Sequence, residues 1–448
     1  MKRLNIKNIK IKKIKYRDPL EIFNEYNKSY YSSLLTGNGP EDISRLSLIG
    51  YNPHAIIRSD INKTEINFEK NDIILNGNIF NHMKSILENI NFKNFKFPVS
   101  KIGLVGYLSF EAYKCIENIE PENKKNYEMP IMEFVLYNNY YYFDHTKNEL
   151  FDIKIQYKGS SILEKKIKPK KILKNKINSY PEKMNYIKNI DKIIDYIKKG
   201  DLYEVNLTGQ YSYKFERNSY NFFKKLYKNN PAPFSAYMNF GERKIISNSP
   251  EMFLKANENR VETRPIKGTV KTSINEKTDK KNRDYLLNSE KEQSELFMII
   301  DLLRNDLSKV CEVNSVRVLN EKKLEKYENV YHLVGIIEGK LSGKKDYIDL
   351  IKATFPGGSI TGCPKIRSIE IIKELEEYER NIYTGSIMIL NNRFLDSSIV
   401  IRTAIIKDNA MYINSGGAIT IDSKTEDEYQ EMKNKISNFM RILNENNI

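Results

Sequence analysis

Runs of aromatic and β-branched residues between residue 1 and about residue 160 predict a part of the chain built mainly from β-strands. Two examples are KIGLVGYLSFEAYK (101–114) and MEFVLYNNYYYFD (132–144). A Lys-dominated segment follows, and because it has few large apolar side chains we interpret it as a solvated linker. We therefore expect a strand-rich N-terminal part at 1–163, a linker at 164–180 and a second part at 181–448.

Helical and strand patterns alternate in this second part. Ile residues in YIKNIDKIIDYIKKGD (186–201) follow helical spacing, and Gly200 stands where a helix C-cap is expected. Further helices are expected at 289–306, 363–377 and 425–443. Single strands are expected at 202–215, near 234–254, near 329–341 and at 410–415, and two strands near 383–404. The mixture predicts an α+β fold in layers.

The charge balance admits a nucleic-acid-binding alternative but does not favour it. Lys plus Arg number 73 and Asp plus Glu 58, which gives a formal net charge of +15. The basic excess is scattered along the chain, whereas a nucleic-acid footprint gathers on one face. We therefore expect no nucleic-acid partner.

The cysteines and the apolar runs exclude further classes of protein. Cys115, Cys311 and Cys363 lie far apart without metal-ligand spacing, so we expect neither a disulfide framework nor a zinc site. Lys and Asn interrupt the apolar residues near the N-terminus, and no apolar run reaches the roughly 18 residues of a membrane span. A cytoplasmic location without membrane contact is expected.

Two pairs of glutamates have the i, i+3 spacing that places both members on one face of a helix: Glu292 with Glu295, and Glu428 with Glu431. If these two faces meet, they offer hard oxygen ligands for one Mg²⁺ that also binds an acidic substrate. The alternative is two solvated helix faces, on which Glu431 forms an ordinary ion pair with Lys435.

The segment FPGGSITGCPKIRS (355–368) is a Gly-rich loop that leads into a helix, with the hydroxyls of Ser359 and Thr361 beside backbone N–H groups. Such a loop suits a carboxylate or phosphate, although it lacks the spacing of a Walker A loop. The alternative is a plain turn.

Lys267 lies in the apolar, turn-rich segment VETRPIKGTVK (261–271), unlike the lysines of the solvated runs. A partly buried lysine can lose its proton near neutral pH and act as a nucleophile or base. Glu251 lies shortly before it in SNSPEMFL, so a two-stranded hairpin could bring the two side chains together. The alternative is a turn lysine and a strand-end acid.

His332 and Arg402 interrupt apolar strands, in ENVYHLVG and VIRTAII respectively. A histidine in such a strand is either catalytic or a hydrogen-bonded core residue. A buried guanidinium requires an anion.

Together these segments resemble the chorismate-utilising enzymes, which include anthranilate synthase component I, aminodeoxychorismate synthase component I and the isochorismate and salicylate synthases. The motifs follow the family order between about residues 180 and 445: SPEMF, TRPIKGT, KEQSELFMIIDLLRNDL, VYHLVG, FPGGSITGCPK, YTGSI, IRTA, SGGAIT and EYQEMKNK. The resemblance implies a layered α/β/β/α fold like that of anthranilate synthase component I. It also implies two orthogonally packed β-sheets and an N-terminal part interleaved with a chorismate-binding catalytic part.

Lys267 favours the aminodeoxychorismate branch, because anthranilate synthases carry Ala in this loop whereas PIKGT resembles the aminodeoxychorismate synthases. The resemblance implies that chorismate and ammonia are converted to 4-amino-4-deoxychorismate, toward para-aminobenzoate and folate. Lys267 would be the nucleophile, Glu251 the general acid, and His332 would lie near the departing hydroxyl. Anthranilate synthase component I is the alternative.

The same resemblance implies a set of binding residues. Mg²⁺ would be held by Glu292, Glu295, Glu428 and Glu431, and the substrate would be contacted by Gly268, Thr269, Ser359, Thr361, Tyr383, Arg402, Gly416, Gly417 and Lys435. No segment resembles a glutamine amidotransferase or a pyruvate lyase. Ammonia is therefore expected from a separate glutaminase subunit, and a separate aminodeoxychorismate lyase would act downstream. Two positions depart from the family, Glu204 in place of the more usual Gln and Cys363 in place of Ala.

Overall fold

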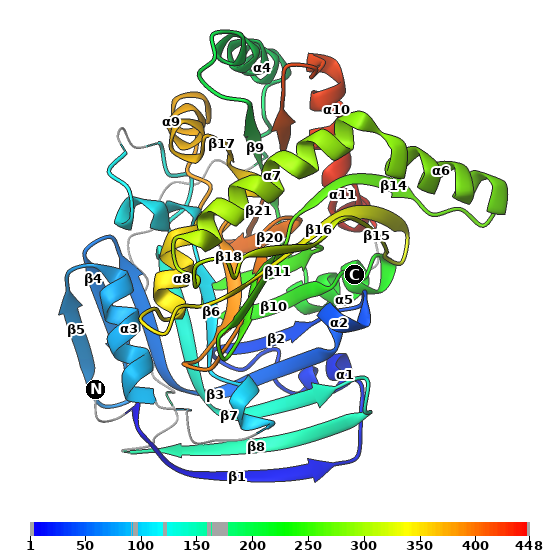
Figure 1. Ribbon diagram of the computed structural model, residues 1–448. Helices are drawn as coiled ribbons and strands as arrows, with labels where there is room; N and C mark the ends of the chain where they lie inside the picture. The colour runs from blue at the N-terminus through cyan, green and yellow to red at the C-terminus, as the bar shows by residue number, and fades with distance from the viewer. Residues whose placement is uncertain are drawn as a thin grey trace.

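The computed structural model describes residues 4–90, 92, 97–119, 123–158, 163 and 178–445. Most of the expected linker, 164–177, lies outside the described residues, so that boundary stays a prediction. Figure 1 shows long strands through the middle of the molecule, with helices packed around them.

The N-terminal part is built mainly from strands, as its aromatic runs predict. The run 132–144 is one strand over its whole length, whereas the run 101–114 is a strand only at its centre. After that centre the chain turns into a 3₁₀ helix, and the Phe110 N–H donates to the Asn381 carbonyl rather than to a strand. The elements are β1 (Ile6–Ile14), α1 (Pro19–Phe23), β2 (Ser32–Thr36), α2 (Glu41–Ser44), β3 (Leu46–Asp60), β4 (Lys63–Asn67), β5 (Asp72–Asn76), α3 (Ile79–Ile90), η2 (Val99–Lys101), β6 (Leu104–Leu108), η3 (Phe110–Cys115), β7 (Met132–Asp144) and β8 (Glu149–Tyr157).

The C-terminal part alternates helices and strands, which confirms the expected α+β pattern. Gly200 follows the first of these helices and has φ of +83°, as a glycine beyond a C-cap often does. The elements are α4 (Lys183–Lys198), β9 (Glu204–Lys214), α5 (Ser219–Asn229), β10 (Phe234–Phe240), β11 (Arg243–Ser249), β12 (Met252–Asn257), β13 (Arg260–Arg264), β14 (Ile266–Lys271), α6 (Glu276–Asn288), α7 (Glu290–Ser308), β15 (Arg317–Lys326), β16 (Val330–Lys340), α8 (Tyr347–Thr354), η4 (Gly358–Ile360), β17 (Gly362–Cys363), α9 (Lys365–Leu375), β18 (Ser386–Leu390), β19 (Phe394–Ile399), β20 (Thr403–Lys407), β21 (Ala410–Ile419), α10 (Thr425–Lys435) and α11 (Ser437–Asn444).

Two expected elements are each divided in the structure. The strand expected near 234–254 is the hairpin β10–β11 followed by β12, and Gly241 takes the positive φ of its tight turn, +71°. The helix expected at 425–443 is α10 and α11, which meet at Ile436. There the Ile436 N–H donates to the Lys433 carbonyl, and the side chain is buried against the core.

β3 and β7 are long paired strands that take part in two sheets. Near one end, β3 lies beside β2 and β7 lies beside β8. Near the other end, β3 lies beside β4 and β7 lies beside β6. The register between β3 and β7 shifts at Pro53–Ala55, next to Asn52 with φ of +56°. Bulges of this kind let strands bend from one sheet into another.

The order of pairing follows from this shared ribbon. The first sheet runs β1-β8-β7-β3-β2-β10-β11-β20-β21-β9-β17, and the second runs β5-β4-β3-β7-β6-β18-β19-β12-β13-β16, with β14 and β15 also on β16. β2 pairs with β10 and β6 with β18, so strands from the N-terminal and C-terminal parts lie side by side in both sheets. The two sheets thus form one antiparallel hydrogen-bonded network.

In the first sheet, successive side chains of a strand lie on opposite faces, and both faces are buried. On β10, Met238 packs in the cluster that also contains Met388 of the second sheet, whereas Tyr237 packs with Phe223 of α5. α4, α5, α9 and α10 contact strands of the first sheet, and α3 and α7 contact strands of the second. The layered helix–sheet–sheet–helix fold is therefore confirmed.

Glu133 on β7 is a buried carboxylate that connects the two sheets. Its Oε1 accepts hydrogen bonds from Arg58 Nε at 2.6 Å and Tyr31 OH at 2.9 Å. Its Oε2 accepts from an Arg243 terminal nitrogen at 2.8 Å and from Tyr107 OH at 3.2 Å. Burial alone would raise the pKa of Glu133, but the two guanidinium groups outweigh it and hold the pKa at about 2.

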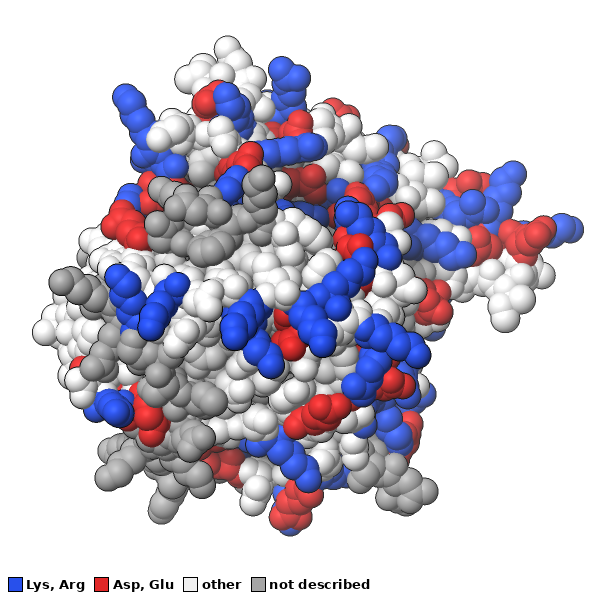
Figure 2. Space-filling model, turned by 90° about the horizontal axis from the view of Figure 1, so that it is seen from below, with Lys and Arg blue, Asp and Glu red and all other residues white. Residues whose placement is uncertain are grey.

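The described surface carries both positive and negative charges, and the described helices fall short of what a membrane span requires. Figure 2 shows Lys and Arg interspersed with Asp and Glu over the face that it presents, which does not favour the nucleic-acid alternative there. Within the described residues, no helix combines the length and the apolar character that crossing a bilayer requires.

The Glu133 cluster generates a prediction about stability. Glu133→Gln removes the counter-charge of two buried arginines, so we expect the free energy of unfolding at pH 7 to fall by about 3–5 kcal/mol, measured by urea denaturation. Glu149→Gln is the matched control. It breaks an ion pair with the exposed Lys13 at 2.7 Å, and such a pair is worth less than about 1 kcal/mol.

The pH dependence of this effect has a definite sign. The pKa of Glu133 is lower in the folded than in the unfolded chain. Its ionised form therefore stabilises the fold above the unfolded pKa, and this contribution disappears as the pH falls toward about 2. The difference between wild type and Glu133→Gln should shrink in acid, and a difference that grows there would contradict the assignment.

Candidate active site

Lys267 directs its amine to two carboxylates from distant elements. It lies on β14 beside a bulge at Gly268, whose φ is +67°. Lys267 Nζ donates to Glu204 Oε1 of β9 at 2.7 Å and lies 3.7 Å from Glu295 Oε2 of α7. Lys267 is 9% exposed and Glu204 is 0% exposed. The lysine is therefore a buried partner of acids and not a solvated turn residue.

The expectation that Lys267 loses its proton near neutral pH is wrong for the free protein. Burial does lower its pKa, but Glu204 and Glu295 outweigh burial and raise the pKa above its ordinary value. Lys267 is thus an ammonium group in the free site.

Glu251 shares the site with Lys267, as the expected hairpin predicts. β12 and β13 pair with Met252 opposite Arg264, and Lys267 follows on β14. Ser359 Oγ donates to Glu251 Oε1 at 2.5 Å. Burial raises the pKa of Glu251 to about 7, although Ser359 and Lys267 act in the opposite direction. A carboxyl group that keeps its proton near neutral pH suits general acid catalysis.

His332 is a neutral imidazole with one free nitrogen. Its Nδ1 lies 2.9 Å from Thr269 Oγ1 and 3.3 Å from the Gly268 carbonyl oxygen, so the proton on Nδ1 donates to that carbonyl. Burial, together with a smaller effect of Arg402, lowers its pKa to about 3. His332 Nε2 is buried and has no hydrogen-bond partner among the described residues. It is available to a ligand.

Arg402 brings a desolvated guanidinium to the same region. Its φ is +50°, and burial lowers its pKa. Within the described part of the chain Arg402 forms no ion pair with an acidic side chain. Such a group can bind a substrate carboxylate.

The four predicted glutamates form one electrostatic cluster. Glu292 and Glu295 lie on α7, and Glu428 and Glu431 lie on α10. Burial would lower the pKa of Lys291, but the four carboxylates together raise it. The two helices therefore bring their glutamates within electrostatic range of one another, while Glu431 also forms the i, i+4 ion pair with Lys435 that the alternative predicts.

The carboxylate oxygens of this cluster are the type of ligand that hard divalent cations bind. A Cβ built on Gly417 would lie 3.2 Å from Glu428 Oε2 and 3.5 Å from Glu431 Oε1, so a larger residue here would contact both carboxylates. Among the described residues, no three acidic, His or Cys side chains already stand in a metal-binding arrangement. Carboxylate oxygens are nonetheless the type of ligand that Mg²⁺ prefers.

Among the remaining predicted residues, Lys435 contacts the cluster, whereas Thr361 and Tyr383 make local contacts. Lys435 Nζ donates to Glu431 Oε1 at 2.7 Å and to the Gly416 carbonyl at 2.8 Å. Thr361 Oγ1 donates to the Gly357 carbonyl at 2.9 Å, so its hydroxyl stabilises the Gly-rich loop. Tyr383 is 7% exposed and its N–H donates to the Arg380 carbonyl.

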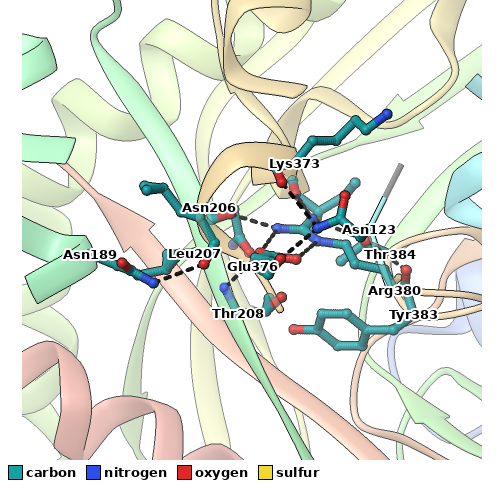
Figure 3. Close-up of polar contacts among 12 residues, drawn as sticks. Asn123, Asn189, Asn206, Leu207, Thr208, Lys373, Glu376, Arg380, Tyr383 and Thr384 are labelled. Carbon is teal, nitrogen blue, oxygen red and sulfur yellow. Dashed lines mark hydrogen bonds and ion pairs between the residues drawn. The ribbon is translucent and has the colours of Figure 1, made fainter. Parts of the chain in front are cut away.

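Arg380 and Glu376 form a buried ion pair that was not predicted from the sequence (Figure 3). Arg380 is 1% exposed, and its guanidinium also donates to the carbonyls of Asn206 at 2.6 Å and Ile360 at 3.0 Å. Glu376 Oε1 also accepts the Thr208 N–H at 2.8 Å. The pair thus binds β9, the Gly-rich loop and the segment before Tyr383 together. The i, i+4 spacing of Glu376 and Arg380 is the sequence feature that could have predicted the pair. It does not show that the pair is buried, because exposed ion pairs on helices have the same spacing.

Comparison with known proteins agrees with this geometry. The family described as chorismate binding enzyme matches residues 31–441. The chain belongs to the chorismate binding enzymes. It is 32% identical to anthranilate synthase component 1 of Aquifex aeolicus over 76% of this chain and 74% of the relative. It is 31% identical to aminodeoxychorismate synthase component 1 of Bacillus subtilis over 89% of each chain.

Solved structures show the same fold. The crystal structure of anthranilate synthase component I from Streptococcus pneumoniae superposes with a TM-score of 0.76 at 26% identity, over 88% of this chain and 91% of that one. The isochorismate synthase of Escherichia coli superposes with a TM-score of 0.74 at 17% identity, over 97% of this chain and 95% of that one.

The Ser359–Glu251 hydrogen bond generates a prediction about pH. A general acid must be protonated, so a role for Glu251 makes chorismate turnover fall as the pH rises past about 7. Ser359→Ala removes a hydrogen bond that lowers the pKa of Glu251, and we expect this limb of the kcat/KM profile to move to higher pH. Both proteins are measured in the same buffers and ammonium salt. A limb that stays in place or moves down would contradict this role.

The Arg380–Glu376 pair generates a second prediction. Arg380→Lys keeps the charge but cannot reach both Glu376 oxygens and two backbone carbonyls. Because a shift of about 1 Å in a site can lower rates on the order of 100-fold, we expect kcat/KM for chorismate to fall by roughly 10-fold to 100-fold with an unchanged circular dichroism spectrum. Arg367→Lys, at an exposed pair with Asp201, is the control and should retain activity.

Proposed function

We propose that this protein is component I of an aminodeoxychorismate synthase, which forms 4-amino-4-deoxychorismate from chorismate and ammonia. The observation that carries the proposal is the buried Lys267 amine, between Glu204 and Glu295 and in one site with the protonated Glu251. The PIKGT loop resembles that of the aminodeoxychorismate synthases, and the relative from Bacillus subtilis bears that name.

The first half of the proposed reaction uses Lys267 and Glu251. Lys267 Nζ passes its proton to Glu204 Oε1, its hydrogen-bond acceptor at 2.7 Å, and attacks ring carbon 2 of chorismate. The two ring double bonds shift, and the bond from carbon 4 to its hydroxyl breaks. Glu251 gives its proton to that hydroxyl, which leaves as water.

The second half reverses this shift. Ammonia adds to carbon 4, the double bonds return, and the carbon 2–Lys267 bond breaks and releases the amine. Glu251, now a carboxylate, takes a proton from the added nitrogen, and Glu204 returns its proton to Lys267. The nucleophilic lysine thus divides one difficult displacement into two steps.

Substrate binding would use the charges around these groups. Glu292, Glu295, Glu428 and Glu431 would hold Mg²⁺, which when bound neutralises the carboxylate conjugated to the reacting carbons. Arg402 would bind the enolpyruvyl carboxylate, and His332 Nε2 would accept a hydrogen bond near the departing hydroxyl.

Ammonia would come from a partner protein in the cytoplasm. The relatives are named component 1, and the sequence holds no segment resembling a glutaminase. A separate glutamine amidotransferase subunit would supply the nitrogen, and a separate lyase would release 4-aminobenzoate.

Anthranilate synthase component I is the second candidate, and it is favoured by the relative from Aquifex aeolicus. That enzyme class would share the fold, the metal and the substrate but would also eliminate pyruvate. The presence of Lys267 argues against it.

Mass spectrometry of the product decides between the two. We expect purified protein with chorismate, Mg²⁺ and ammonium at alkaline pH to yield aminodeoxychorismate, and Lys267→Ala to lower the rate at least about 100-fold because the nucleophile is lost. Lys271→Ala, on the exposed end of β14, should retain the rate. Anthranilate from the wild type, or full activity of Lys267→Ala, would contradict the proposal.

A further inference from the structure

Lys365 is a largely buried amine that the proposed reaction does not use. Its side chain is 15% exposed, and its Nζ donates to Asp306 Oδ2 at 2.6 Å and to the Thr354 carbonyl at 2.8 Å. Asp306 lies near the end of α7 and is 1% exposed. Breaking such a pair is costly, because it leaves a buried charge without its partner. Lys365 therefore fixes the start of α9 to the ends of α7 and α8.

These contacts hold the two ends of the Gly-rich loop together. The loop, 355–364, begins directly after α8 and ends directly before α9. Thr354 and Lys365 are thus the residues on either side of it, and the hydrogen bond between them closes the loop at its base. Ser359, near the middle of the loop, donates to Glu251 Oε1. The position of this hydroxyl depends on the path that the loop takes from its base.

The half of the loop before Ser359 has little other polar support. After Ser359, the Thr361 carbonyl accepts the Asn206 N–H of β9 at 2.8 Å. Before Ser359, in the part of the chain that the structure describes, residues 356–358 form hydrogen bonds only within the loop. The first half of the loop is therefore anchored where Lys365 binds its starting point.

We propose that Lys365 is a positioning residue for the general acid: it closes the base of the Gly-rich loop and thereby holds the Ser359 hydroxyl against Glu251. This inference rests on the proposed function, because it takes Glu251 as the acid of the reaction. Lys365 touches neither Glu251 nor Ser359 in the described contacts, so its effect on the acid passes through the loop.

The titration of Glu251 reports on the Ser359 hydrogen bond. Burial raises the pKa of Glu251 to about 7, and the bond from Ser359 acts in the opposite direction. The charged or titratable groups near Glu251 are Lys267 of β14, Lys435 of α10 and Tyr327, which follows β15. None of these three lies on the Gly-rich loop. Losing the Ser359 bond should therefore move the pKa of Glu251 upward without removing any of these groups.

The pH profile of kcat/KM for chorismate tests the proposal. We expect Lys365→Met to move the limb above pH 7 to higher pH by about 0.5–1 pH unit, as the loss of one hydrogen bond implies. Ser359→Ala should give the same shift, and the double variant should give no further shift, because both changes remove the same bond. A Lys365→Met protein whose kcat/KM falls equally at every pH would show a purely structural role and would overturn the proposal. So would additive shifts in the double variant.

Lys309→Met is the matched control. Lys309 Nζ donates to the other oxygen of Asp306 at 2.8 Å, but the lysine lies on the exposed side and does not touch the loop. The limb should therefore stay in place. An equal shift in Lys309→Met would assign the effect to the charge of Asp306 and would overturn the role of Lys365.

A second variant covers the case in which Lys365→Met does not fold. Asp306→Asn removes the charge that holds Lys365 but keeps an oxygen as acceptor. We expect the limb to move in the same direction by a smaller amount. A folded Asp306→Asn protein with the limb of the wild type would overturn the proposal.

Infrared spectroscopy separates this inference from the proposed function. The C=O band of the protonated Glu251 carboxyl is measured without chorismate, as the difference between each protein and its Glu251→Gln version. In the wild type the band should disappear above about pH 7, and in Lys365→Met it should persist to higher pH. This shift without a matching limb in the activity would contradict the acid role and support the positioning role. A band that titrates at the same pH in both proteins would overturn the positioning role whatever the reaction.

Discussion

The buried ion pair of Arg380 and Glu376 supports the segments on which the candidate site is built. A fully desolvated guanidinium must find acceptors for its donors, and Arg380 finds them on Glu376, on β9 and in the Gly-rich loop. Glu376 in turn fixes the Thr208 N–H of β9. Because an unsatisfied charge is expensive there, these segments are held in one arrangement. Glu204 on β9 and Ser359 in the loop are positioned as a consequence.

The site concentrates opposite charges where neither sign is fully exposed to water. Lys267, Lys291 and Lys435 lie among acidic side chains from three elements, and each lysine has at least one carboxylate within 4 Å. In the free protein these lysines neutralise the cluster. The proposed substrate and metal bring their own charges, so binding would exchange internal ion pairs for new ones. Before binding, burial keeps Glu251 protonated near pH 7, whereas the neighbouring carboxylates keep Lys267 charged.

The sequence predicts those helices and strands whose apolar periodicity lies within a single segment. α4, α7 and β7 follow from periodicity within one segment, and their bounds are close to those expected. The shared β3–β7 ribbon did not follow, because it depends on pairing between residues far apart in the chain and on a bulge at Pro53–Ala55. The hairpin at Gly241 and the break at Ile436 were also missed, since the apolar pattern continues through both. The two-sheet architecture itself came from the resemblance to a family.

The sequence by itself determined the chemical groups of this protein: a lysine in an apolar turn, glutamates paired at helical spacing, and a Gly-rich loop with hydroxyls. Only the tertiary structure decided what state these groups are in. Lys267 is charged because Glu204, from another strand, lies 2.7 Å away, and Glu251 keeps its proton because the folded chain excludes water from it. Periodicity reports which face of an element is apolar, whereas a pKa depends on burial and on charges that distant segments bring to the same place.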